Sequence, residues 1–193
     1  MATIGFSTKF PWGKKTHFIL KIWKGLIDNN ICDEEDFCLY YPNILCDDLE
    51  NGFELSHLNP KIHTIREDKA DLWKPGRKIN PVVFNRTKDR FQFAPVLECK
   101  SVQVINISYV NTVGVYNVKT NTDLRVVVAV DGKVAVYDVW EFDEVLPAFE
   151  KVRDKIGMEE LAQNDGFNSV QEFFWYFNKD FTGKIIHWIE LDY

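Results

Sequence analysis

The sequence predicts a single α+β domain of 193 residues, in which a small mixed β-barrel has helices packed on it. Segments rich in β-branched and aromatic residues dominate from about residue 78 to residue 140, as expected for strands. Few segments show the spacing of an amphipathic helix, and the chain closes with another strand-like segment. Many short strands with few helices are typical of small barrels, and a 46% hydrophobic content is sufficient for one core.

The N-terminal residues predict a strand followed by a helix. Residues 3–10 form the predicted strand, and Thr16 is placed to cap a helix that ends near Ile27. The apolar face of this helix comprises Phe18, Ile19, Ile22, Trp23, Leu26 and Ile27. Lys21 and Lys24 are assigned to the opposite face, which predicts an amphipathic surface helix.

Residues 28–54 are strongly acidic. They contain nine Asp or Glu and no Lys or Arg, with Asp33-Glu34-Glu35-Asp36 and Asp47-Asp48 supplying most of the charge. A charge run of this kind predicts a solvated insertion, and a dedicated partner site is the alternative. A metal site would require these carboxylates to converge in space.

Strand signals dominate the middle of the chain. Four segments are rich in β-branched and aromatic residues: Lys78–Phe84, Phe91–Phe93, Ser101–Val110 and Val113–Val118. Farther on, Leu124–Val130 and Lys133–Val139 flank Asp131-Gly132, which is the strongest hairpin signal in the chain. We therefore expect these last two segments to pair through a two-residue turn.

The C-terminal part predicts three helices, a turn and a strand. A helix near Pro147 would place Phe149, Val152 and Ile156 on one face and end at Gly157. The other elements are a short helix over Met158–Gln163, a turn over Asn164–Phe167 with Gly166 at positive φ, a helix opened by the capping box Ser169–Glu172, and a strand over Lys184–Leu191.

Composition excludes several classes of protein. No apolar run approaches the roughly 20 residues that span a bilayer, and the N-terminus does not resemble a signal peptide. We therefore expect a cytoplasmic protein without a membrane partner. Its four cysteines are then expected to be reduced, and their spacing does not match a zinc site. Neither a metal nor a cofactor is predicted.

The basic residues concentrate in residues 61–90. This segment has nine Lys or Arg against four Asp or Glu, a net charge of +5 in a chain whose net charge is −6. Such segregation predicts a local anion or nucleotide site rather than general affinity for nucleic acid. RNA or a modified nucleoside is therefore the expected partner.

Lys61 and Thr64 open this basic segment and are candidates for nucleophilic catalysis. A threonine hydroxyl needs a neighbouring base, and a lysine can serve if burial or another cation lowers its pKa. Arg66 and Lys69 are close enough in sequence to supply such a cation. The alternative is a basic loop in which the Thr64 hydroxyl bonds to the local backbone.

His63 and two aromatic residues are further candidates. His63 alternates with Ile62 and Thr64, which predicts either a side chain facing a cleft or a packed residue. Trp73 and Phe167 flank loops, where an aromatic ring could stack on a nucleobase.

Lys61-Ile62-His63-Thr64-Ile65-Arg66 with Lys74-Pro75-Gly76 resembles the signature of ASCH domains, members of the PUA-like superfamily. That signature reads Gly-x-Lys-x-x-Ser/Thr, followed by Lys-x-Gly before a barrel strand, and Asn59 stands here at the glycine position. The resemblance covers about residues 55–193 and leaves the strand, helix and acidic insertion of residues 1–54 outside it. The whole chain is also similar to proteins encoded by phages and by Bacteroidetes-type genomes.

The resemblance implies a PUA-like β-barrel with a cleft for RNA or a nucleotide. Some members are amidohydrolases that remove the acetyl group from N4-acetylcytidine with a lysine, a threonine and a glutamate. By resemblance, Lys61, Thr64 and Asp165 hold these catalytic positions. The expected substrate or nucleic-acid contacts are His63, Arg66, Trp73, Lys74, Arg77, Lys78 and Phe167.

Three functional hypotheses follow. The first is an ASCH-type pocket for a nucleoside or RNA, whose sharper form is an amidohydrolase acting on N4-acylated cytidine. The second is a non-catalytic RNA-binding module that holds phosphates through Arg66, Arg77 and Lys78. The third is a phage-encoded interaction protein that uses the acidic segment 28–54 to capture a partner.

Overall fold

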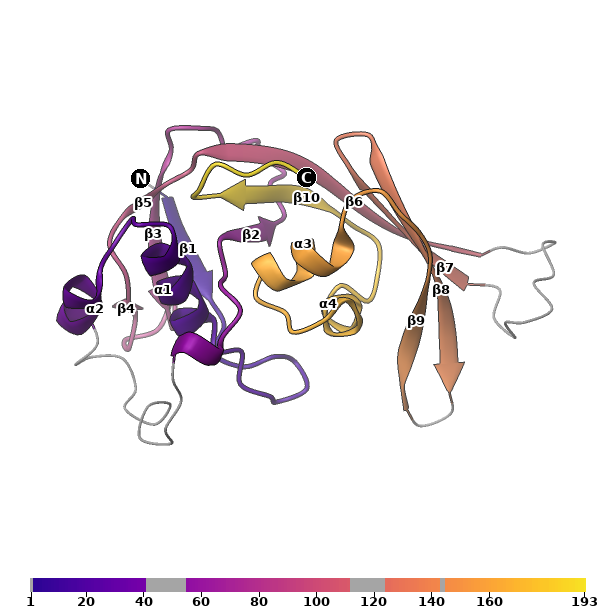
Figure 1. Ribbon diagram of the computed structural model, residues 1–193, viewed down its shortest axis with the longest axis horizontal. Helices are drawn as coiled ribbons and strands as arrows, with labels where there is room; N and C mark the ends of the chain where they lie inside the picture. Colours follow the sequence, from indigo (N-terminus) through magenta and orange to yellow (C-terminus); the bar gives the residue numbers. More distant parts are fainter. Residues whose placement is uncertain (1, 41–54, 112–123, 143–144) are drawn as a thin grey trace.

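A computed structural model describes residues 2–40, 55–111, 124–142 and 145–193 of the chain (Figure 1). Its helices are α1 (Phe18–Asp28), α2 (Glu34–Tyr40), α3 (Met158–Asn164) and α4 (Val170–Tyr176), with a 3-10 turn at Leu55–His57. Its strands are β1 (Ala2–Phe6), β2 (His63–Arg66), β3 (Lys78–Val83), β4 (Phe91–Gln92), β5 (Leu97–Glu98), β6 (Ser101–Asn111), β7 (Leu124–Val130), β8 (Lys133–Phe142), β9 (Val145–Asp154) and β10 (Phe181–His187). The expected α+β class is therefore confirmed.

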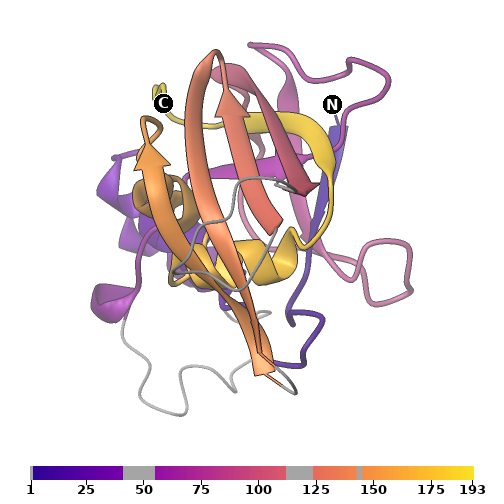
Figure 2. The same cartoon turned by 90° about the vertical axis from the view of Figure 1, so that its right-hand side faces the viewer.

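The larger sheet is antiparallel and curls into a half-barrel around α3 and α4 (Figures 1 and 2). Its strand order is β2-β10-β6-β7-β8-β9. Every second residue of β7 is buried, because successive side chains of a strand point to opposite faces. On the inner face, Tyr137 and Phe149 pack their rings against Phe174 of α4, at centroid distances of 5.1 and 4.8 Å.

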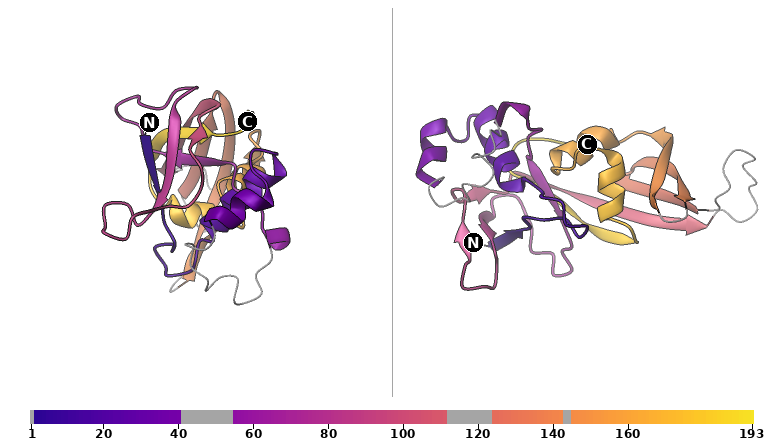
Figure 3. Two further views of the ribbon diagram at one scale, coloured as in Figure 1. Left: turned by 90° about the vertical axis from the view of Figure 1, so that its left-hand side faces the viewer. Right: turned by 90° about the horizontal axis from the view of Figure 1, so that it is seen from below.

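The smaller sheet lies beside α1, at the opposite end of the molecule from the β7–β9 ribbon (Figures 1 and 3). In it, β3 pairs in parallel with β1 and antiparallel with β4 and β5. The indole of Trp23 in α1 donates a hydrogen bond to the carbonyl oxygen of Phe93 at 2.8 Å. Phe6 of β1 contacts both Phe93 and Trp188, so the two sheets share one hydrophobic core.

The strongest local signals of the sequence are confirmed. Strands β7 and β8 pair across Asp131-Gly132, whose φ values of 45° and 87° suit a two-residue hairpin turn. Helix α4 begins after Ser169, whose hydroxyl accepts a hydrogen bond from the Glu172 backbone amide at 3.2 Å.

The helix expected near Pro147 is wrong, because residues Val145–Asp154 form β9. This strand lies at the edge of the sheet, where a proline is tolerated, and pairs with β8. Phe149 is buried but Val152 is 51% exposed, so their helical spacing does not reflect a common face. Gln171 of α4 bonds to both the amide and the carbonyl oxygen of Phe149 and so satisfies this edge of the sheet.

The acidic insertion is partly folded. Helix α2 lies within it, and Phe37 and Tyr40 pack against Trp23 with ring centroids 5.3 and 5.6 Å apart. Residues 41–54, and the strand expected at Val113–Val118, lie outside the described residues. The opening strand is shorter than expected, and β2 and β5 were not predicted as strands.

No helix in the described parts of the chain is long and apolar enough to cross a membrane. Cys32, Cys38 and Cys99 are free thiols, and Cys46 lies outside the described residues. Within the described ranges, no group of three or more His, Cys, Asp or Glu is arranged to hold a metal ion.

Candidate active site

Lys61 and Asp165, which are 104 positions apart, form a buried ion pair. Lys61 precedes β2 and is 1% exposed, whereas Asp165 directly follows α3 and is 4% exposed. The Lys61 Nζ atom lies 2.5 Å from the Asp165 carboxylate and also donates to the Asp165 backbone carbonyl oxygen. The structure therefore brings together two of the three residues expected to be catalytic.

Helix α1 holds the backbone of Lys61. The Lys61 amide donates to the carbonyl oxygen of Lys21 at 2.8 Å, and the next amide, that of Ile62, donates to the carbonyl oxygen of Asn164 at 3.0 Å. Gly25 permits this contact, since a Cβ atom there would lie 2.6 Å from the Lys61 carbonyl oxygen. The helix is therefore locked to the segment that carries the site lysine.

Gly166 completes the turn after Asp165, as the sequence predicts. Its φ is +93°, and a Cβ atom there would lie 2.8 Å from the ring of Phe18 and 3.0 Å from Lys61 Cδ. The same Phe18 ring lies 4.7 Å below the Lys61 ammonium. A glycine is required here both for its backbone conformation and for the space that the site occupies.

Gly166→Ala is therefore expected to lower the free energy of unfolding by about 3 kcal/mol, through backbone strain together with overpacking. Gly132→Ala is the matched control, since Gly132 has a φ of +87° but a Cβ atom there would meet nothing within 4 Å. We expect it to lose only about 1 kcal/mol from strain. Urea unfolding measures both, and equal losses would contradict the packing argument.

Thr64 and Arg66 lie on β2, on the same face of the strand because they are two residues apart. Thr64 is 3% exposed and lies on a strand. The alternative of a basic loop is therefore wrong for this residue. The Ile65 amide donates to the Asp165 carboxylate at 3.3 Å and ties the strand to the ion pair.

The Arg66 guanidinium lies between the two sheets. It donates to the Gly5 carbonyl oxygen at 3.0 Å and lies 5.3 Å from the centre of the Phe6 ring. Its Nε atom is buried and has no partner within the described part of the chain. Gly5 and Phe6 also line a pocket of about 440 Å³, which lies beside the end of β1.

Burial brings the two ionisable groups of the pair toward neutrality. It lowers the pKa of Lys61 to about 8, against the opposing attraction of Asp165, and Arg66 and Lys21 lower this pKa further. Burial also raises the pKa of Asp165, although Lys61 and Arg66 oppose this effect. With a pKa near 8, roughly a tenth of Lys61 is uncharged at pH 7. A lysine and a carboxyl group whose pKa values are shifted toward their uncharged forms can support acyl transfer to or from a nearby hydroxyl.

His63 lies in the core rather than in an open cleft, so the packed interpretation holds. It is fully buried, and its ring lies 5.1 Å from that of His187 and 5.5 Å from that of Tyr193. The Tyr193 hydroxyl is 3.2 Å from His63 Nδ1 and accepts a hydrogen bond from the Asn164 side chain at 2.8 Å. This cluster therefore holds Asn164, the residue that precedes Asp165, through its hydrogen bond to Tyr193.

The buried His187 should make stability depend on pH. Burial lowers its pKa to about 4, so the unfolded chain binds the extra proton between about pH 6.5 and 4. The free energy of unfolding should therefore fall by about 3 kcal/mol from this group as the pH falls through that window. Urea unfolding at pH 7 and pH 4.5 should show a smaller loss for His187→Phe than for wild type. His57→Phe is the control because His57 is exposed, and an equal loss in all three proteins would contradict the assignment.

The two aromatic rings expected to stack a base are both buried. Trp73 is 8% exposed and covered by the Arg77 guanidinium at 5.5 Å, and Phe167 is 1% exposed within a cluster of aromatic rings. Tyr176, which the sequence analysis missed, is 40% exposed and contacts Phe167 at 5.4 Å. Its hydroxyl interacts electrostatically with Arg66. Tyr176 is therefore the better candidate to contact a planar ligand.

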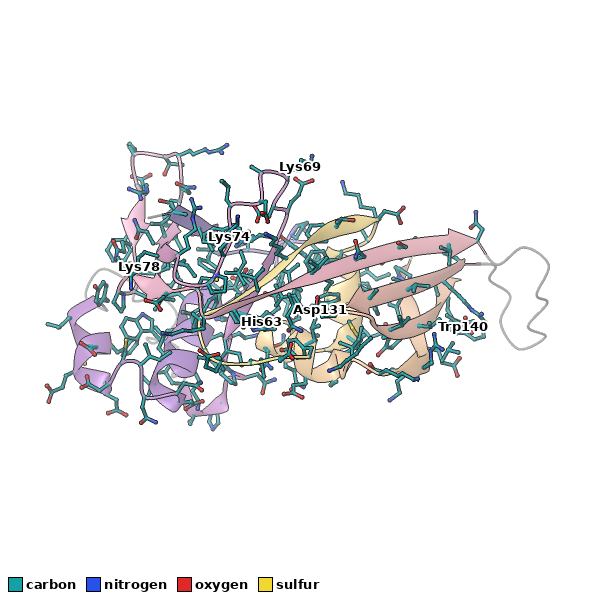
Figure 4. All side chains as sticks on the ribbon, turned by 90° about the horizontal axis from the view of Figure 1, so that it is seen from above. His63, Lys69, Lys74, Lys78, Asp131 and Trp140 are labelled. Carbon is teal, nitrogen blue, oxygen red and sulfur yellow. The ribbon has the colours of Figure 1, made fainter. Side chains whose placement is uncertain are left out.

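The exposed lysines expected to bind the ligand, Lys74 and Lys78, each pair with an acidic residue (Figure 4). Lys74 pairs with Asp71 and Lys78 with Glu98, at 3.3 and 2.5 Å. The Arg77 guanidinium donates to the Leu72 carbonyl oxygen at 2.5 Å. The structure thus separates Lys74, Arg77 and Lys78 from the buried pair and gives each one a local partner.

Lys21 is the main residue of the site that sequence reasoning placed wrongly. It is 2% exposed, whereas Lys24, expected on the same face, forms a salt bridge with Asp28 on the outside of α1. Lys21 lies three residues after Phe18 and four residues before Gly25. Phe18 and Gly25 both face the site. The helical spacing i, i+3, i+7 therefore places Lys21 on the same face of α1 as Phe18 and Gly25. Lys21 was assigned to the solvent face because it is charged.

Comparison with known protein families, with curated proteins and with solved structures gave no match for this chain. The function therefore has to be inferred from the chemistry of the site.

Proposed function

We propose that this chain carries an ASCH-type pocket that hydrolyses the amide of an N4-acylated cytidine. The observation that supports this most is the buried Lys61–Asp165 pair, which the Ile65 amide ties to the strand that carries Thr64. Such a pair is unfavourable for both charges, and strongly perturbed groups of this kind concentrate at functional sites. Lys61 and Thr64 match the residue types of the family that the sequence resembles, and Asp165 stands in the place of its glutamate.

In the proposed reaction, uncharged Lys61 accepts the proton of the Thr64 hydroxyl as its oxygen attacks the acyl carbonyl carbon. The C–N bond of the resulting tetrahedral intermediate breaks, and Asp165 passes the proton from the Lys61 ammonium to the departing exocyclic amine, so that both groups return to their starting forms. A water molecule then hydrolyses the acyl ester on Thr64, which releases the carboxylic acid and restores the hydroxyl. Lys61 must turn from Asp165 toward Thr64 for the first step, as catalytic hydrogen bonds often tighten only with substrate.

Arg66 and Tyr176 are proposed to hold the ligand. The Arg66 Nε donor has no partner among the described residues, and Arg66 lies on the same face of β2 as Thr64. An arginine in this place can bind a carbonyl or phosphate oxygen. The exposed ring of Tyr176 can contact the base.

The experiment is hydrolysis of N4-acetylcytidine and other N4-acylcytidines, followed by chromatography, with wild type, Lys61→Ala and Thr64→Ala. Lys69→Ala is the matched control, because Lys69 is an exposed lysine that pairs with its neighbour Glu67. Loss of turnover in the first two variants, with circular dichroism unchanged and with Lys69→Ala active, would support the proposal. Full activity in Lys61→Ala or Thr64→Ala would contradict it.

RNA binding without catalysis is the second proposal, and the exposure of Lys74 and Lys78 favours it. Their surface pairs are weak and can exchange for phosphate. Absence of turnover by wild type, combined with RNA affinity that falls steeply with salt, would favour this second function over the first.

A further inference from the structure

We infer that Lys21 of α1 is a positioning residue, which holds the turn carrying Asp165 against the segment carrying Lys61. This inference rests on the proposed function and identifies a part of its site. It also makes the N-terminal helix necessary to a site whose sequence signature covers only residues 55–193.

Lys21 contacts both segments that carry the ion pair, the turn after Asp165 and the backbone of Lys61. Its Nζ atom donates to the carbonyl oxygen of Gly166 at 2.6 Å and to the side-chain oxygen of Asn168 at 2.9 Å. Its own carbonyl oxygen accepts the hydrogen bond of the Lys61 amide at 2.8 Å. One residue therefore sets the distance between the Lys61 backbone and the turn that follows Asp165.

Glu172 holds the same turn from the other side. One of its carboxylate oxygens accepts the Asn168 amide hydrogen bond at 2.8 Å, and the other pairs with Lys14 at 2.8 Å. Glu172 is 4% exposed. The turn is therefore clamped between a buried cation on α1 and a buried anion on α4.

The charge of Lys21 is not explained by an ion pair. Its two acceptors are uncharged oxygens, and no carboxylate of a described residue lies within 4.0 Å of its Nζ atom. A buried ammonium without a carboxylate partner is unfavourable, and a neutral side chain of similar length would avoid this cost. Its contacts instead connect the turn after Asp165 to Lys61.

Several charged groups face Lys61 and Lys21. Asp165, Arg66 and His63 surround Lys61 together with Lys21, while Glu172 and Lys14 act on Lys21. The Lys21 ammonium favours the uncharged form of Lys61, which is the form that accepts a proton. Lys21 thus acts on the reaction by geometry and by charge, without touching the substrate.

The test compares Lys21→Met, Lys21→Arg and, as matched control, Lys24→Met on the outside of the same helix. The titration of Lys61 is followed through its ¹³Cε resonance, assigned by its absence in Lys61→Arg, and kcat and KM are measured on N4-acetylcytidine. In Lys21→Met we expect the Lys61 midpoint to rise, because a like charge that lowers it is removed. We expect kcat to fall about 100-fold with KM within about threefold. Lys21→Arg should keep the midpoint near that of wild type, and Lys24→Met should change neither quantity.

An unchanged Lys61 midpoint in folded Lys21→Met would overturn the inference, even if kcat fell, since a merely structural lysine would not alter this titration. If Lys21→Met does not fold, Lys21→Gln replaces it, because glutamine keeps a donor for the Gly166 carbonyl oxygen and removes the charge. If wild type turns over no substrate, the proposed function fails, whereas the Lys61 titration still decides the role of Lys21.

Discussion

Lys61→Arg is expected to lower kcat/KM at least about a thousandfold, because a guanidinium stays protonated and cannot accept the Thr64 proton. The same assignment predicts the pH profile of wild type. Burial lowers the pKa of Lys61 to about 8, and the base is the deprotonated form. Hydrolysis of N4-acetylcytidine should therefore accelerate as the pH rises from 6 to about 8, and then level off.

The hydroxyl of the proposed nucleophile has its own matched variants. Thr64→Val keeps the shape of the side chain and removes the oxygen, so it should be inactive, whereas Thr64→Ser should keep measurable turnover. Lys69→Arg, at an exposed position, should behave like wild type. A Lys61→Arg enzyme that retains both its rate and a rise in activity near pH 8 would exclude Lys61 as the base.

Removing one member of the Lys61–Asp165 pair should destabilise the protein by about 3–5 kcal/mol, because it leaves the other charge buried and unpaired. Lys61→Met and Asp165→Asn are suitable single variants, since asparagine keeps an oxygen for the Ile65 amide. Lys61→Met/Asp165→Asn should regain this loss and reach at least the stability of wild type. The double variant should nevertheless be inactive.

Urea unfolding of the four proteins at pH 7 gives the coupling energy of the pair. Lys78→Met is the surface control, and we expect it to leave the stability unchanged because the Lys78–Glu98 pair is exposed. A double variant that loses as much as the two single variants combined would show that the pair serves stability. In that case the buried charges would need no catalytic explanation.

Local sequence signals predicted much of the fold. The Asp131-Gly132 turn, the capped helix after Ser169 and the strand over Leu124–Val130 were all identified, because their causes lie within a few neighbouring residues. Strand β9 was predicted as a helix, since its pairing with β8 and its contacts with Gln171 depend on distant parts of the chain. Tertiary contacts overrode the spacing of its apolar residues.

The candidate site, like the fold, could be predicted from the sequence only in part. The Lys61–Thr64 spacing and the glycine turn at Gly166 are readable in the sequence, as is the resemblance that connects them to Asp165. The burial of His63 and the contribution of Lys21 are not, because each depends on which face of its strand or helix meets another element.

The sequence by itself determined the α+β class, the main hairpin and the capped helix, since residue type and short-range spacing are sufficient for these. The candidate catalytic residues Lys61, Thr64 and Asp165 came from the family resemblance. Only the tertiary structure decided that Lys61 meets Asp165, that Lys21 joins their two segments, and that Lys74 and Lys78 have acidic partners of their own. Contacts between residues about a hundred positions apart depend on how the helices pack on the curled sheet. Packing of this kind buries Lys61, and burial lowers the pKa of its amine to about 8.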